Sequence, residues 1–203
     1  MANILLNLRN TVIAGFVLTV VMIVIVAGAT RQGIPGDYAW VTFLFRWLHV
    51  LSGVMWIGLL WYFNFVQTPS MPKIPDEQKP AVSKVIAPAA LFWFRWAAMA
   101  TIVTGLILAW MNGYLVDALT LGAAGGFGAP KNIAIGIGMW LGAIMWFNVW
   151  FIIWPNQQKA LGMVQVEADA KAKAARLAGL TSRFNTMLSV PMLYAMVSAQ
   201  NIY

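Results

Sequence analysis

Residues 38–68 read YAWVTFLFRWLHVLSGVMWIGLLWYFNFVQT, an apolar stretch in which the only charged side chain is that of Arg46. A helix needs about 20 consecutive, mostly apolar residues to cross a bilayer core about 30 Å thick. At about 1.5 Å per residue this stretch is longer than that, so we expect a helix that is tilted or projects from the membrane. The stretch therefore predicts an all-α membrane protein.

The composition of the whole chain agrees with this class. Of the 203 residues, 61% are hydrophobic and only 9% are charged, and the mean hydropathy is +0.75. A soluble domain carries about 25% charged residues, and a disordered chain has low hydrophobicity, so both classes are excluded. The net charge of +7 is explained by basic loops that contact anionic membrane lipids, and we expect no nucleic-acid partner.

The apolar runs predict an integral membrane helical bundle of about five transmembrane helices, in a single transmembrane domain over 1–203. The expected spans are 12–30, 38–68, 85–114, 133–154 and 184–203, the last with a kink at Pro191. A cleaved signal peptide is the alternative for the first run, because Ala27-Gly28-Ala29 resembles a cleavage site. We expect a retained span, since only Arg9 precedes the run.

The basic residues outside the spans predict the orientation. Segments on the side of the N-terminus hold nine of them and segments on the other side hold two. The nine are Arg9, Lys73, Lys79, Lys84, Lys159, Lys171, Lys173, Arg176 and Arg183, and the two are Arg31 and Lys131. Because cytoplasmic loops are enriched in Lys and Arg, we expect an N-in/C-out topology.

Three connecting segments have distinctive compositions. The loop 69–80 contains four prolines and is expected to be extended, close to polyproline II. The alanine-rich segment 157–180 is expected to form a cytoplasmic amphipathic helix on the membrane or an extension of the fourth span. The glycine-rich loop 121–130 is expected to be flexible or re-entrant.

Polar residues of the second span gather on one stripe of the helix. At about 100° per residue, Arg46, His49, Gly53, Trp56 and Asn64 fall within roughly 80° of one another. Polar groups within a bilayer are costly and face protein, a cavity or a cofactor. We therefore expect this stripe to face the interior of the bundle.

His49 is the only histidine and the chain has no cysteine. The missing cysteines exclude disulfides, iron–sulfur ligation and covalent c-type haem, whereas haem b requires only an axial ligand such as imidazole. Gly53, one turn from His49, would leave room for the macrocycle. A hydrogen-bonded structural histidine, a proton relay and another metal are the alternatives. A sixth haem ligand would be a Met, water, a partner's residue or His49 of a second copy.

Other polar residues within the spans are further candidates. Arg46 and Arg95 have no acidic residue within any span to neutralise them, so each either snorkels to the interface or binds an anion such as a haem propionate, an anionic substrate or a lipid phosphate. Asn64 and Asn148 are candidates for substrate contact or for interhelical hydrogen bonds, and the latter is favoured for Asn148.

Four blocks resemble a known family. They are RWLHVLSGVMWIGLLWYFNFVQTP (46–69), FRWAAMATIVTGLILAW (94–110), MWFNVWFIIWPNQQK (145–159) and SRFNTMLSVPMLY (182–194). In order and spacing they resemble the membrane domain of bacterial cytochrome c-type urate oxidases, known as the urate oxidase N-terminal domain. The resemblance implies a multi-pass helical domain in the bacterial inner membrane that oxidises urate and passes electrons to the respiratory chain.

The family's best-known members carry a C-terminal cytochrome c, and this sequence has no CxxCH motif. We therefore expect a membrane-embedded redox protein that binds haem b and passes electrons to a separate cytochrome or quinone. Two alternatives remain: a non-catalytic accessory subunit of a larger respiratory or photosynthetic complex, and a small transporter. Homo-oligomerisation stays open, as does whether the chain is an enzyme.

Overall fold

The computed structural model describes residues 2–33 and 35–203, and within them every regular element is a helix. The chain divides into two compact units, residues 1–44 and residues 45–203. Unit 1 consists of α1 (Ala2–Leu5), α2 (Leu8–Thr30) and the first turns of α3 (Tyr38–Trp61). The all-α class predicted from the sequence is confirmed for the described residues.

The apolar helix α2 begins and ends with well-formed caps. The side chain of Asn7 accepts hydrogen bonds from the backbone N–H groups of Arg9, at 3.0 Å, and Asn10, at 3.3 Å. Such a cap satisfies N–H groups that the first helical turn leaves unpaired. At the other end Arg31 adopts a left-handed conformation with φ 56°.

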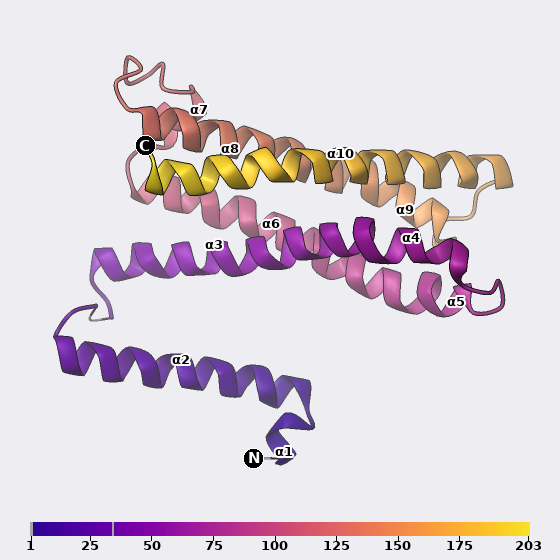
Figure 1. Ribbon diagram of the computed structural model, residues 1–203, viewed down its shortest axis with the longest axis horizontal. Helices are drawn as coiled ribbons and strands as arrows, with labels where there is room; N and C mark the ends of the chain where they lie inside the picture. The colour runs from indigo at the N-terminus through magenta and orange to yellow at the C-terminus, as the bar shows by residue number, and fades with distance from the viewer. Residues whose placement is uncertain (1, 34) are drawn as a thin grey trace. The chain divides into compact units, whose positions relative to one another are not determined.

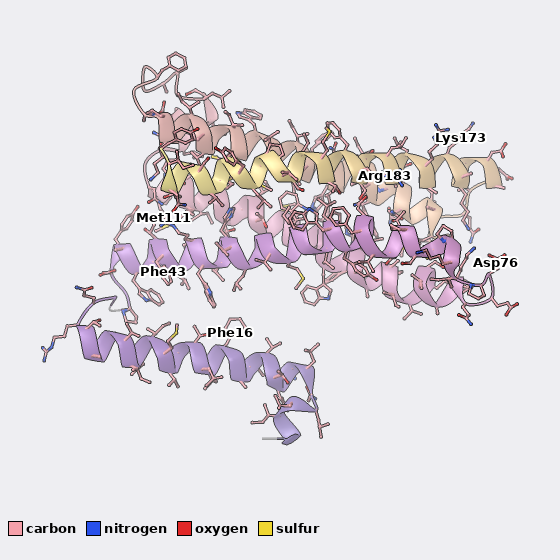
Figure 2. All side chains as sticks on the ribbon, in the orientation of Figure 1. Phe16, Phe43, Asp76, Met111, Lys173 and Arg183 are labelled. Carbon is pink, nitrogen blue, oxygen red and sulfur yellow. The ribbon has the colours of Figure 1, made fainter. Side chains whose placement is uncertain are left out.

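Unit 2 is built from four long helical segments within the described residues (Figure 1). The first is α3 with η1 (Tyr62–Gln67), α4 (Thr68–Ser70) and η2 (Met71–Lys73); the second is α5 (Lys79–Ala81) with η3 (Val82–Ile86) and α6 (Ala87–Met111). The third is α8 (Pro130–Phe147) with η4 (Asn148–Ile153) and α9 (Trp154–Ala160); the fourth is α10 (Ala168–Asn201). Asp76 and Lys173 lie at one end of these segments and Met111 lies at the other (Figure 2).

The core of unit 2 lies where all four segments meet. Trp56 and Leu60 of α3 pack with Phe94 of α6 and Met145 of α8, and each is at most 1% exposed. Helix α10 packs along α8, η4 and α9 and closes the bundle. Burial of these large apolar side chains holds the long helices side by side.

Four helical segments are long and apolar enough to cross a membrane, which fits a membrane protein. They are Leu8–Thr30, Tyr38–Lys73, Lys79–Met111 and Pro130–Ala160. The expected fifth span, 184–203, instead forms the second half of α10, a helix whose first half is rich in charged residues. The number of spans and the N-in/C-out orientation therefore stay predictions.

The connecting segments differ from expectation in two places. The proline-rich loop 69–80 is not extended, because Pro69, Pro72 and Pro80 are each the second residue of one of the short helices α4, η2 and α5. Proline fits there, since the first N–H groups of a helix have no intrahelical partner. The expected helix over 157–180 is also interrupted: α9 ends at Ala160, Gly162 has φ +75°, and α10 begins at Ala168.

The glycine-rich loop 121–130 is a series of turns tied to α7 (Leu115–Leu119). The carboxylate of Asp117 accepts a hydrogen bond from the backbone N–H of Gly125 at 2.7 Å. It accepts a second from the side-chain amide of Asn132 at 2.9 Å. One acidic side chain therefore joins α7, the loop and the start of α8.

Candidate functional site

His49 lies on α3 and its imidazole contacts α6. Its Nδ1 lies 2.9 Å from the carbonyl oxygen of Thr101 and 3.3 Å from Oγ1 of Thr104. A carbonyl oxygen can only accept, so Nδ1 carries the proton and donates it to Thr101. The neutral imidazole is thereby fixed in the tautomer with a lone pair on Nε2.

The glycine that accommodates the imidazole is Gly105 of α6. A Cβ atom at Gly105 would lie 2.8 Å from Cε1 of His49 and 3.1 Å from its Nδ1. At Gly53, by contrast, a Cβ atom would meet nothing within 4 Å. The small residue that His49 requires therefore comes from the neighbouring helix, and Gly53 lies beside open space.

Nε2 of His49 has no hydrogen-bond partner among the described residues. The side chain is half-buried. An imidazole that donates one N–H to a backbone carbonyl and keeps its other nitrogen free has the arrangement of a metal-ligating histidine. The described residues include no cluster of three or more His, Cys, Asp or Glu side chains that would hold a metal ion by themselves.

Arg46 lies one turn before His49 and is exposed. Its positive charge acts on Tyr114, which follows α6 at the end of the segments marked by Met111. Burial raises the pKa of the Tyr114 phenol, and the charge of Arg46 partly opposes that rise. Arg46 thus lies close enough to Tyr114 to influence its ionisation, and the described residues offer it no carboxylate within 4.0 Å.

Arg95 lies away from this site. Its guanidinium Cζ lies 3.2 Å from the ring centroid of Trp154 and 5.8 Å from that of Trp150, which is a cation–π arrangement. Along α6, Arg95 precedes Thr101 by six residues, or about 9 Å. The structure therefore places Arg95 in an aromatic cluster, and within the described residues it makes no hydrogen bond with His49.

Trp56 belongs to the hydrophobic core rather than to the surroundings of His49. It is 1% exposed and follows His49 by seven residues, about 10 Å along the helix. Its indole Nε1 is buried and has no hydrogen-bond partner among the described residues.

Asn64 and Asn148 both make interhelical hydrogen bonds. The side-chain amide of Asn64 donates to Oγ of Ser182 at 2.8 Å and to the carbonyl of Leu60 at 2.9 Å. Asn148 donates to Oδ1 of Asn185 at 2.8 Å. Asn185 in turn donates to the carbonyl of Met145 at 2.9 Å, so Asn148 makes a hydrogen bond of the interhelical kind favoured for it.

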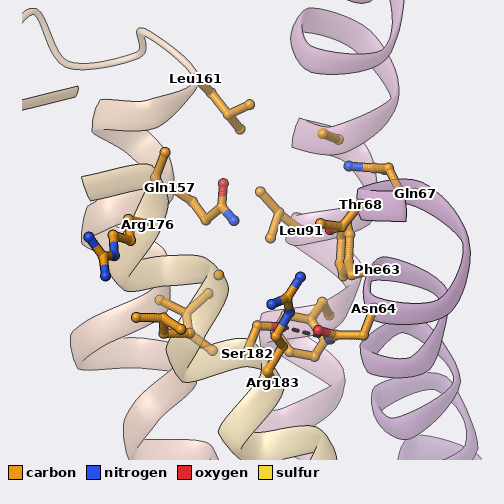
Figure 3. A pocket seen from close by; sticks show the side chains of 16 residues that line it. Phe63, Asn64, Gln67, Thr68, Leu91, Gln157, Leu161, Arg176, Ser182 and Arg183 are labelled. Carbon is orange, nitrogen blue, oxygen red and sulfur yellow. Dashed lines mark hydrogen bonds between the residues drawn. The ribbon is translucent and has the colours of Figure 1, made fainter. Parts of the chain in front are cut away.

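A cavity of about 370 Å³ lies toward the end of the segments marked by Asp76 and Lys173. Residues from η1, α4, α6, η4, α9 and α10 border this region, and the π-helical turns η1 and η4, a type of turn frequent at functional sites, form part of it. The polar side chains around it are Asn64, Gln67, Thr68, Gln157, Arg176, Ser182 and Arg183. Figure 3 shows Arg183 reaching into the cavity and Arg176 pointing away from it.

The sequence did not single out the partners of His49 or this cavity. Thr101, Thr104 and Gly105 lie within the block TIVTG of the third apolar run, where small and hydroxyl-bearing residues favour close helix contact. Arg176 and Arg183 are seven residues apart and therefore lie on similar faces of one helix. The TIVTG block and the seven-residue spacing of the two arginines are the sequence features that point to the His49 site and to the cavity.

Fold and composition together define this chain as an all-helical protein with segments suited to crossing a membrane. Residues 127–202 match the family model described as urate oxidase N-terminal. The match covers α8, η4, α9 and α10, and it confirms the resemblance for this part of the chain. No curated protein and no solved structure matches the chain.

Proposed function

We propose that this chain is a redox protein of the bacterial inner membrane that binds haem b through Nε2 of His49. The observation that carries the proposal is the hydrogen bond from His49 Nδ1 to the Thr101 carbonyl. It fixes the tautomer and ring orientation and increases the basicity of Nε2, as outer-shell partners of metal-ligating histidines do. The match to the urate oxidase N-terminal family supports a redox role.

The residues that would hold haem b are His49 and Arg46. His49 would bind the haem iron through Nε2, and Arg46, one turn away and exposed, would form charge-assisted hydrogen bonds with a propionate. When bound, haem b supplies one-electron chemistry. The chain contributes the orientation of the imidazole, through Thr101 and Gly105, and a positive charge near the interface.

The position of His49 suggests where electrons leave. Its partners Thr101 and Thr104 precede Met111, the last residue of α6, by seven to ten residues, or about 10–15 Å. We infer that a separate cytochrome or a quinone exchanges electrons at this end of the bundle. The basic residues of the sequence predict that this end faces away from the cytoplasm.

Absorption spectra of the protein, purified gently from its native membrane, test this proposal. The oxidised and dithionite-reduced protein should show a Soret band and a b-type α band, and His49→Ala should lose both while eluting at an unchanged size. Ser52→Ala is the matched control, because the Ser52 hydroxyl lies on the same helix and, among the described residues, bonds only the Leu48 carbonyl. A colourless wild-type protein, produced with sufficient haem supply, would contradict the proposal.

A second candidate role is that of an accessory subunit in a larger respiratory or photosynthetic complex. Several polar side chains within the bundle are already paired between helices, including Asn148 with Asn185 and Trp61 with Ser189 at 3.0 Å. Such bonds stabilise a bundle without requiring a ligand. This role predicts co-purification with a larger partner at fixed stoichiometry and no chromophore on this chain.

A further inference from the structure

The cavity near Arg183 has the chemistry of an anion site. None of its sixteen lining residues is acidic, and of the two arginines among them Arg183 reaches into the cavity (Figure 3). Arg183 has no ion-pair partner among the described residues, because the salt bridge that they form joins Lys79 and Asp76. A guanidinium without a carboxylate, at the rim of a cavity, favours a ligand that brings its own negative charge.

Side-chain amides give the cavity a second recognition element. Gln67 and Gln157 line it, and no hydrogen bond is formed by either side chain within the described residues. An unpaired side-chain amide at the wall of a cavity is available to a ligand. A ligand with hydroxyl groups would pair with such amides, since a hydroxyl both donates and accepts.

The remaining wall of the cavity is apolar and fixed. Phe94 and Leu91 are 1% and 3% exposed, and Ile153 is 2% exposed. Asn64 and Ser182 are joined by their own hydrogen bond across the helices, which holds the polar side of the cavity in place (Figure 3). The volume of about 370 Å³ lies within the range of small-molecule sites.

We propose that this cavity binds a phosphate group with a hydroxylated substituent, the chemistry of a glycerophosphate. Arg183 would hold the phosphate, and the amides of Gln67 and Gln157 would pair with the hydroxyl groups. The ligand is either a soluble glycerophosphate or the headgroup of an anionic phospholipid, because the basic residues near the cavity face the membrane surface in the predicted topology. This site is separate from His49 and does not depend on haem.

Thermal unfolding of the full chain in phosphatidylcholine nanodiscs tests the proposal with two probes. One probe is sn-glycerol 3-phosphate added to the solution, and the other is phosphatidylglycerol included in the bilayer. A response to the soluble probe identifies a soluble ligand, and a response to phosphatidylglycerol alone identifies the lipid headgroup. The unfolding temperature should rise with at least one probe, because a ligand that binds only the folded state stabilises it.

Variants of α10 distinguish the cavity from general surface charge. Arg183→Gln should lower the affinity for the stabilising probe about tenfold or more. Arg176→Gln should leave this affinity unchanged, because Arg176 points away from the cavity (Figure 3). Gly179→Phe should fill the cavity and abolish the response without removing charge, since a Cβ atom at Gly179 would meet nothing within 4 Å. Equal responses in all variants, or no response of the wild-type protein to either probe, would overturn the proposal.

Discussion

At the scale of single residues, the surroundings of His49 depend on close approach between α3 and α6. A Cβ atom 2.8 Å from Cε1 of His49 is closer than real contacts allow, so any residue larger than Gly105 forces the imidazole or α6 to move. The hydrogen bond from Nδ1 to the Thr101 carbonyl opposes that movement. The orientation of the imidazole is therefore set by the Thr101 carbonyl and by the space that Gly105 leaves beside the ring.

Gly105→Ala should displace the imidazole and weaken its bond to Thr101. We expect the variant to lose roughly 1–3 kcal/mol of stability, as overpacked interiors do, and to bind several-fold less haem. The ratio of haem to protein in reduced spectra measures the second effect. Gly53→Ala is the control, because its Cβ would meet no atom within 4 Å. Equal haem content in the two variants would contradict the assignment of Gly105.

The contrast between these glycines shows what could be predicted about the site. Helical spacing placed Gly53 beside His49 on α3, and this spacing is correct for a single helix. The spacing of residues along α3 does not indicate which residue of another helix approaches the imidazole. His49 and Arg46 were therefore found from the sequence, whereas Thr101 and Gly105 required the packing of α3 against α6.

At the scale of helices and loops, hydropathy predicted the long segments well and the connections poorly. The expected spans 38–68, 85–114 and 133–154 all lie within continuous helical segments or their ends. The loop 69–80 was mispredicted because proline fits polyproline II and the first turn of a helix equally well. The cavity at Arg183 was missed because four segments distant in sequence must meet to form it.

The contact between α7 and α8 depends on Gly136. A Cβ atom at this position would overlap the carbonyl oxygen of Ala118, which is backbone and cannot rotate away. Gly136→Ala should therefore separate α7 from α8 and lower stability by about 1–3 kcal/mol. Thermal unfolding in detergent measures the loss.

Gly142→Ala provides the control for Gly136→Ala. Gly142 is also buried in α8, but a Cβ atom there would meet nothing within 4 Å. Alanine favours a helix over glycine by about 1 kcal/mol, so this variant should be as stable as the wild-type protein or more stable. If both variants were destabilised alike, a general intolerance of α8 to alanine would replace the contact with Ala118 as the explanation.

At the scale of the whole molecule, exposed tryptophans indicate where unit 2 meets the two membrane surfaces. Trp93 and Trp110 of α6 are 57% and 70% exposed, and 17 residues of helix correspond to about 26 Å. This separation is close to the thickness of a bilayer core, and tryptophan is enriched at membrane interfaces. The cation–π cluster of Arg95 and Trp154 would then lie near one interface, and Arg46 near the other.

Orientation decides which compartment each site faces, and the absence of native cysteine makes it measurable. Two single-cysteine variants mark the two ends of unit 2: Gln78→Cys at one end and Ala123→Cys at the other, both at exposed positions. Because basic residues concentrate at the Gln78 end, Ala123→Cys should react with a membrane-impermeant maleimide in intact cells, whereas Gln78→Cys should react only after the inner membrane is permeabilised. The reverse pattern would invert the topology and place the end nearest His49 in the cytoplasm. A periplasmic cytochrome would then be ruled out as its electron partner, and a quinone would remain.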